Sequence, residues 1–148
     1  MKIFHILFLV QGLALLSACA TPAGKLKDSD FVSRTIEVQK PVSHTLSSFY
    51  EGLRFCGPES GGVVFVTHHG VPECSPMRPD GSAVCDLYMG GGNSGHSSLI
   101  LGRADFTPTS QGSSITLRVQ SYVAGKEKIL DAWEKFINGK AKEVCPEN

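Results

Sequence analysis

Five cysteines are the residues of this sequence whose type and spacing say most about its chemistry. Cys19 directly follows an apolar N-terminal run, whereas Cys56, Cys74, Cys85 and Cys145 are spread over the rest of the chain. An even number of thiols in a chain of this size is typical of disulfides when the chain is exported from the cytoplasm. Metal binding would favour closely spaced Cys-x-x-Cys pairs, and the sequence has none. We therefore expect two disulfides among the last four cysteines.

Four cysteines allow three pairings. Cys74 and Cys85 flank a proline-rich segment, so a bridge between them would fasten the base of a hairpin. Cys56 ends the first predicted helix and Cys145 follows the second, and these ends can meet if both helices pack on one sheet face. This long bridge would close a loop of about 90 residues and contribute roughly 4 to 5 kcal/mol, against roughly 3 or less for the short one. The predicted pairs are Cys56–Cys145 and Cys74–Cys85.

Two other segments contain residue types used in catalysis or metal binding. Gly92-Asn93-Ser94-Gly95-His96 differs from a nucleophile elbow, because its fifth residue is histidine and it leads into another predicted strand. It also lacks the Lys-Ser/Thr of a phosphate loop, so it predicts a turn. His68 and His69 could ligate a metal with Glu73 or Cys74, but adjacent residues on an extended chain point to opposite sides. No catalytic residue, metal or cofactor is expected, and an enzyme built on these histidines or His96 is the less favoured alternative.

The N-terminal segment has the pattern of an export signal. Met1-Lys2 precede an apolar stretch from Ile3 to Leu16, which is shorter than a membrane-spanning helix. Its end, Leu16-Ser17-Ala18-Cys19, resembles the lipobox of bacterial lipoproteins at all four positions. The resemblance implies that the thiol of Cys19 receives a diacylglyceryl group, that the chain is cut before it, and that the new amine is acylated, with palmitate as the expected label. The alternative is an ordinary signal peptide cut after Ala18, with Cys19 as a spare thiol.

A lipid on Cys19 determines the expected location. One acyl chain gives marginal membrane binding, whereas the three chains that the resemblance implies would hold the protein permanently. In enteric lipoproteins an aspartate after the cysteine favours the inner membrane, and here that residue is Ala20. We therefore expect anchoring at the outer membrane, facing the periplasm, with exposure at the cell surface left open. The expected divisions are a signal peptide at 1–18, a flexible anchored linker at 19–30 and one domain at 31–148.

The overall charge argues against one class of partner. Fourteen basic residues balance fourteen acidic ones, so the chain has no cationic excess to neutralise phosphates. Nucleic acid is therefore not an expected partner. No second apolar stretch approaches membrane-spanning length, so the lipid is the expected membrane attachment.

Hydrophobic periodicity predicts the structural elements. The segment from His68 to Gly81 holds three prolines and two glycines and predicts an irregular loop. The elements expected in chain order are a strand at 31–39, a helix at 41–55, strands at 62–67, 82–89, 97–106 and 114–123, and a helix at 126–138. The alternation at 114–123 is the clearest, with Ile115, Leu117, Val119 and Ser121 inward and Thr116, Arg118, Gln120 and Tyr122 outward.

Apolar side chains at helical spacing, among them Phe49, Tyr50, Trp133 and Phe136, predict the core. Arg34 interrupts the inward face of the first strand. It is expected to snorkel outward near a sheet edge, or to pair with Glu37 or Asp131.

The predicted fold is a two-layer α+β domain. Its order is β-α-β-β-β-β-α, with an antiparallel sheet of about five strands and two helices on one face. This order resembles the helix-grip or TATA-binding-protein-like arrangement, which also occurs in the BamC lipoprotein. Small envelope lipoproteins of unassigned function show a similar pattern, with a helix ending like Arg54-Phe55-Cys56 and a late cysteine like Cys145. These resemblances bring no activity with them.

Two functions follow as hypotheses. The first is a non-enzymatic interaction or accessory module of the cell envelope, whose partners would be envelope proteins or peptidoglycan. The second is a binder of a lipid or other small hydrophobic ligand between sheet and helices. A pocket of a few hundred Å³ between the layers would favour the second, and a dense core would favour the first.

Overall fold

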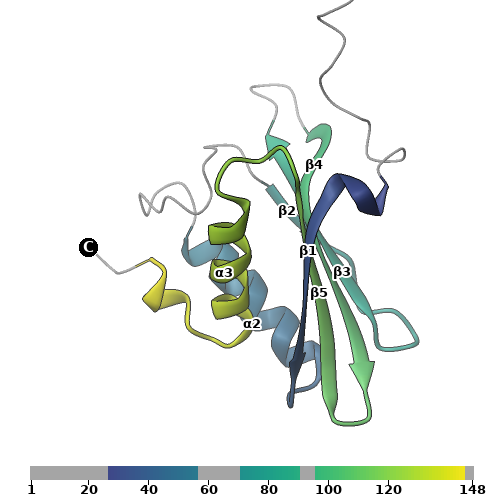
Figure 1. The fold of residues 1–148 in the computed structure, drawn as a ribbon. Coiled ribbons are helices and arrows are strands. Elements are labelled where there is room, and N and C mark those ends of the chain that lie inside the picture. The colour runs from purple at the N-terminus through teal and green to yellow at the C-terminus, as the bar shows by residue number, and fades with distance from the viewer. Residues whose placement is uncertain (1–26, 57–70, 91–95, 146–148) are drawn as a thin grey trace, which may run out of the picture.

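The computed structural model describes residues 27–56, 71–90 and 96–145. In chain order the elements are η2 (Asp28–Asp30), β1 (Phe31–Val38), α2 (Val42–Phe55), β2 (Val71–Cys74), β3 (Ala83–Gly90), β4 (His96–Thr109), β5 (Gly112–Gln120), α3 (Lys126–Ile137) and η4 (Ala141–Glu143). The strands form one sheet of order β1-β5-β4-β3-β2, antiparallel throughout, and both helices cover the same face (Figure 1). The predicted α+β class, with two helices on one face of an antiparallel five-stranded sheet, is confirmed.

The alternation of β5 determines which face of the sheet is covered. Ile115, Leu117 and Val119 are buried under the helices, while Thr116 and Arg118 point to the other face and are half-buried. Directly paired residues of antiparallel strands point to the same side, so the pairing of Ile36 with Ile115 extends the apolar face onto β1. Among the described residues, the sheet therefore has one face under the helices and one that no element covers, which we call the uncovered face.

Aromatic rings fill the space between the two layers. Phe49 of α2 meets Phe106 of β4 and Trp133 of α3 edge-on, with ring centroids 5.6 and 5.5 Å apart. A methyl group added to Gly52 would lie 2.4 Å from Cγ of Phe136. A methyl group on Gly102 would lie 2.5 Å from Cη2 of Trp133. Each glycine therefore leaves a ring just enough room, and the layers are densely packed at these positions.

At Trp133 the close packing of the ring leaves a polar group without a hydrogen bond. Its indole N–H is buried without an acceptor among the described residues. Burying a donor without a partner costs about 1–3 kcal/mol. We infer that the shape of the ring, enclosed by Gly102 and Phe49, offsets that cost.

The short edge strand β2 was not predicted. The strand expected at 62–67 lies outside the described residues, and β2 occurs in the segment for which an irregular loop was predicted. That prediction was wrong for Val71–Cys74, which pairs with Tyr88–Cys85.

Proline in β2 is tolerated because of its position in the ladder. The N–H of Ser75 donates to the carbonyl of Val84 at 2.8 Å, and antiparallel pairs alternate between bonded and non-bonded. Pro72 lies three residues before Ser75, so its pair with Leu87 is non-bonded. The nitrogen of Pro72 therefore points away from β3. No ladder bond is lost there.

Three other expectations are corrected. The last strand ends at Gln120, and residues 121–125 form a turn, so Ser121 is exposed and does not face inward. Gln120 was expected to face outward but is buried, and its Nε2 donates to the carbonyl of Ile100 at 2.7 Å. Tyr50 is 39% exposed, because its part of α2 borders the narrow edge strand. Residues 28–30, at the end of the expected linker, form η2.

Candidate functional site

Several sequence-predicted positions lie outside the described residues. These are Cys19 with the lipobox, His68 with His69, and the glycine-rich segment around Ser94. His96 opens β4, but the structure describes only its backbone. In the described ranges no group of three or more potential ligand side chains forms a metal site. No helix there is long and apolar enough to cross a membrane.

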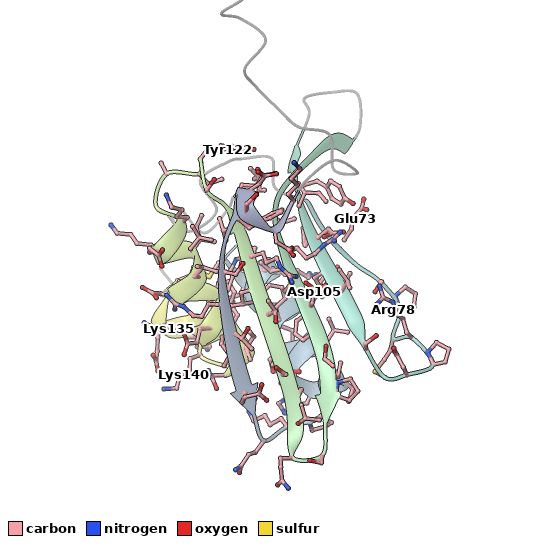
Figure 2. All side chains as sticks on the ribbon, turned by 45° about the vertical axis from the view of Figure 1, so that its right-hand side comes forward. Glu73, Arg78, Asp105, Tyr122, Lys135 and Lys140 are labelled. Carbon is pink, nitrogen blue, oxygen red and sulfur yellow. A yellow bond between two sulfur atoms is a disulfide. The ribbon has the colours of Figure 1, made fainter. Side chains whose placement is uncertain are left out.

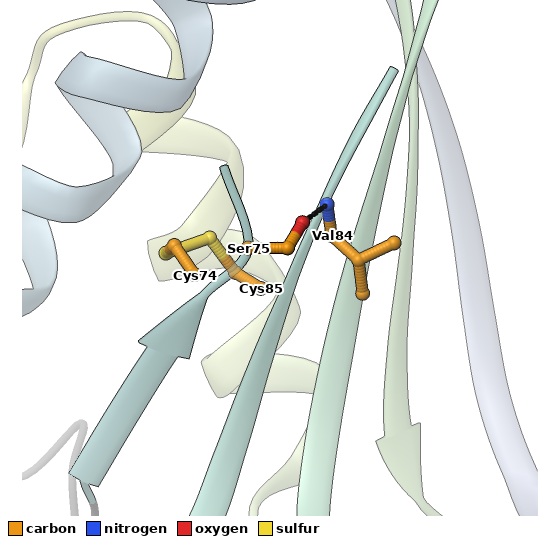
Figure 3. Close-up of a disulfide and its surroundings, with 4 residues drawn as sticks. All are labelled: Cys74, Ser75, Val84 and Cys85. Atoms are coloured by element: carbon orange, nitrogen blue, oxygen red, sulfur yellow. Dashed lines mark hydrogen bonds between the residues drawn. A yellow bond between two sulfur atoms is a disulfide. The ribbon is translucent and has the colours of Figure 1, made fainter. Parts of the chain in front are cut away.

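The structure contains the two disulfides that the sequence led us to expect. Cys56–Cys145 joins the end of α2 to the chain beyond η4, with Cα atoms 5.6 Å apart and both residues buried. Cys74–Cys85 links directly paired residues of β2 and β3, with Cα atoms 4.0 Å apart (Figure 3). Beside it, the N–H of Val84 donates to Oγ of Ser75 at 3.1 Å. The short bridge thus fastens the edge strand to the sheet.

Charged side chains are arranged in pairs on the uncovered sheet face. Arg103 and Arg118 are direct partners across β4 and β5, a like-charge pairing that is unfavourable on its own. Arg103 donates to both carboxylate oxygens of Asp86, from Nε at 2.6 Å and from Nη2 at 3.0 Å. Arg118 donates from Nη1 to Asp105. Each guanidinium therefore has its own carboxylate, and the four charges hold one another in fixed positions.

The surroundings shift the protonation of two groups. The hydrogen bond with Asp86 raises the pKa of Arg103 above its usual value, against the opposing effect of burial. Burial raises the pKa of the Tyr88 phenol, with smaller contributions from Asp86 and Glu73. Tyr88 therefore stays neutral as a hydrogen-bonding group beside the charged pairs.

These side chains line a depression of about 390 Å³ on the uncovered face, which we name the polar hollow. Its lining includes Glu73, Arg78, Asp86, Tyr88, Arg103 and Asp105. Figure 2 shows Glu73, Arg78 and Asp105 on this side of the molecule, away from Lys135 and Lys140 near the helices. With both signs of charge and a phenol, the hollow suits a polar or zwitterionic group.

A second concavity lies on the other side of β2. This apolar groove, about 680 Å³ in volume, runs between α2 and β2. Tyr50 and Met77, which are 39% and 51% exposed, line it together with Leu46 and Pro72. Glu73 and Cys74 belong to the lining of both concavities. The edge strand β2 is therefore a wall with a polar surface on one side and an apolar surface on the other.

Sequence reasoning missed both concavities. A usable signal existed for the polar hollow, because Asp86, Arg103, Asp105 and Arg118 all occupy outward positions of strands. Their pairing depends on the register of three strands, which the positions of these residues along the sequence do not reveal by themselves.

Comparison with known proteins gives no further guidance, because no protein-family model, curated protein or solved structure matches this chain.

Proposed function

We propose that this protein is a lipid-anchored, non-enzymatic interaction module of the bacterial cell envelope. In this proposal Cys19 is acylated at the outer membrane, and the domain faces the periplasm. The partner, an envelope protein or peptidoglycan, binds along the edge strand β2. The lipobox of residues 16–19 supports the anchor, and two disulfides suit an oxidising compartment.

One structural observation carries the choice of surface. Tyr50 and Met77 are exposed in the apolar groove, and across β2 the polar hollow presents charges in fixed positions. Aromatic and methionine side chains are enriched at protein interfaces, and preorganised polar groups give specificity. A partner that contacts both sides of β2 would bury Tyr50 and Met77 and would pair with the charges of the polar hollow.

The dense packing between sheet and helices favours this function over an internal hydrophobic ligand. Such a ligand would have to displace Phe136 from Gly52 or Trp133 from Gly102, where the rings already leave no room for a methyl group. The apolar groove, by contrast, opens at the surface beside α2 and β2.

Two measurements test the proposal. Metabolic labelling with a palmitate analogue should label the wild type and not the Cys19→Ala variant. A photo-cross-linking amino acid in place of Tyr50 should capture a defined envelope partner in cells, whereas the same amino acid at Lys135, exposed on α3, should not. Equal capture at both positions, or none at Tyr50, would remove the β2 edge as the binding surface.

A further inference from the structure

The start of the folded part is tied to the turn between β5 and α3. The N–H of Ser121 donates to the carbonyl of Asp30 at 2.8 Å. Nε of Arg118, near the end of β5, lies 3.9 Å from Oδ1 of Asp28. Residues 27–30 and 121–125 therefore form one end of the domain, and Tyr122 lies at that end (Figures 1 and 2).

The proposed anchor restricts how far this end can lie from a bilayer. Seven residues, 20–26, separate Cys19 from Lys27. At no more than about 3.3–3.6 Å per residue, this stretch reaches at most about 30 Å. A lipid on Cys19 therefore keeps Lys27 within about 30 Å of the membrane surface.

The side chains at this end suit contact with lipid headgroups. Tyr122 is 59% exposed, the largest exposed fraction among the large apolar side chains in the described ranges. Tyrosine is favoured at membrane interfaces, where its ring meets the apolar region and its hydroxyl meets water. Tyr122 thus has the chemistry of an interfacial anchor and lies at the same end of the domain as Lys27.

Charged side chains that could contact lipid headgroups also lie beside Tyr122. Lys27, Lys126 and Lys128 lie in or next to the two joined segments, and their ammonium groups make no ion pair within the described part of the chain. Three carboxylates lie among these lysines: Asp28, whose side chain is 99% exposed, is 3.9 Å from Arg118, Asp30 accepts from the N–H of Lys27, and Glu127 is 3.5 Å from Arg34. This end therefore presents both signs of charge, which suits headgroups that carry a phosphate and an amine.

We propose that this end, which carries Lys27, Tyr122, Lys126 and Lys128, rests on a phospholipid bilayer rich in phosphatidylethanolamine. Tyr122 enters the headgroup layer, and the lysines contact lipid phosphates. The inference rests on the proposed lipid anchor and adds an orientation to it. The β4–β5 hairpin then points away from the membrane, because β5 runs from Gly112 at that hairpin to Gln120 beside the bilayer.

Quenching by brominated lipids tests the orientation in the full-length acylated chain. The Tyr122→Trp variant is reconstituted in vesicles of phosphatidylethanolamine and phosphatidylglycerol whose acyl chains carry bromine near the headgroup. Gln111→Trp is the matched control, since Gln111 is exposed in the opposite hairpin, about 30 Å along β5. The buried Trp133 supplies a constant background, which the wild type measures.

The added tryptophan at position 122 should lose most of its emission, and the one at position 111 should not. Lys126→Ser with Lys128→Ser should reduce the quenching at position 122. If the chain is acylated and floats with the vesicles but both tryptophans are quenched equally, the orientation is overturned and the anchor stands. If the chain takes up no palmitate analogue, the anchor fails and the orientation fails with it.

Discussion

Arg34 points from the inward face of the edge strand β1 onto α3, where its Nη1 donates to Asp131 at 2.7 Å. The same nitrogen donates to Glu134 at 3.0 Å, and Nη2 lies 3.5 Å from Glu127. Hydrogen bonding to Asp131 raises the pKa of the guanidinium from its usual value. A charge on the inward face of an edge strand discourages pairing with another chain. Arg34 therefore connects β1 to the helix and also protects the longer free edge.

Replacing this arginine should change association more than stability. For Arg34→Met we expect a loss of about 1 kcal/mol or less in urea unfolding, because the three carboxylates are exposed. We also expect concentration-dependent self-association by light scattering. Arg54→Met, at an exposed position near the end of α2, is the control. An Arg34→Met protein that stays monomeric would show that the edge is protected in another way.

Gly52→Ala should destabilise the protein although alanine is the better helix former. In an exposed helix the exchange would gain about 1 kcal/mol. Here the new methyl group would lie 2.4 Å from Phe136, so overpacking should cost a net 1–3 kcal/mol, about the range found for added methylenes in tight cores. Urea unfolding measures the change, with Ser47→Ala on the exposed face of α2 as control. A stabilised Gly52→Ala protein would contradict the close packing of α2 on α3.

The two disulfides should differ in both stability and reactivity. Replacing Cys56 and Cys145 by serine should cost about 4 to 5 kcal/mol, and replacing Cys74 and Cys85 about 3, from the lengths of the closed loops. Reduction should follow the opposite order, because Cys74 is half-buried on an edge strand whereas Cys56 and Cys145 are buried. Alkylation and mass spectrometry along a dithiothreitol time course would show which disulfide is reduced first. Earlier reduction of Cys56–Cys145 is the result that we do not expect.

The stabilising effect of the ion pair between Asp86 and Arg103 should depend on the forked geometry of the guanidinium. Arg103→Lys keeps the charge but cannot donate from two nitrogens to both oxygens. Since the Arg103 side chain is 41% exposed, we expect a loss of only about 1 kcal/mol, discounted for solvent screening. A double-mutant cycle with Asp86→Asn should show coupling of similar size. Independent effects of the two substitutions would mean that the paired charges do not stabilise one another.

Alkaline pH should destabilise the protein through Tyr88. Its folded-state pKa is raised above 10.0 by burial, so the unfolded state loses the phenolic proton first. The contribution of Tyr88 to the free energy of unfolding should therefore be fully present below pH 10. It should fall above pH 10, as the unfolded form gains the phenolate, and be lost beyond the folded-state pKa. Tyr88→Phe should lack this part of the decline. The difference between the absorbance titrations of the two proteins should place the midpoint of Tyr88 above 10.

Local periodicity predicted most of the architecture. The alternation of Ile115, Leu117 and Val119 identified β5 and its buried face, and the stripe with Trp133 and Phe136 identified α3. Both patterns span several residues, so burial of one face leaves a clear trace in them. Asp131 was one of the partners considered for Arg34 because a charge on an inward face needs a nearby opposite charge.

What the sequence could not predict depends on contacts between distant segments. β2 has four residues and contains Pro72, so only its pairing with β3 makes it a strand. Tyr50 follows the apolar stripe of α2 and yet is exposed, because that stripe extends past the edge of the sheet. The pairing of Arg103 with Asp86 depends on strand register, which no local pattern encodes.

The bridge between Cys56 and Cys145 has a consequence for survival among peptidases. A single cut of the backbone anywhere between these residues leaves both fragments joined through sulfur. Because β2 and the polar hollow lie within this span, a nicked molecule keeps them attached to its N-terminal portion. It would separate only after a second nick or after reduction, so damage to one exposed peptide bond does not by itself release the β2 edge.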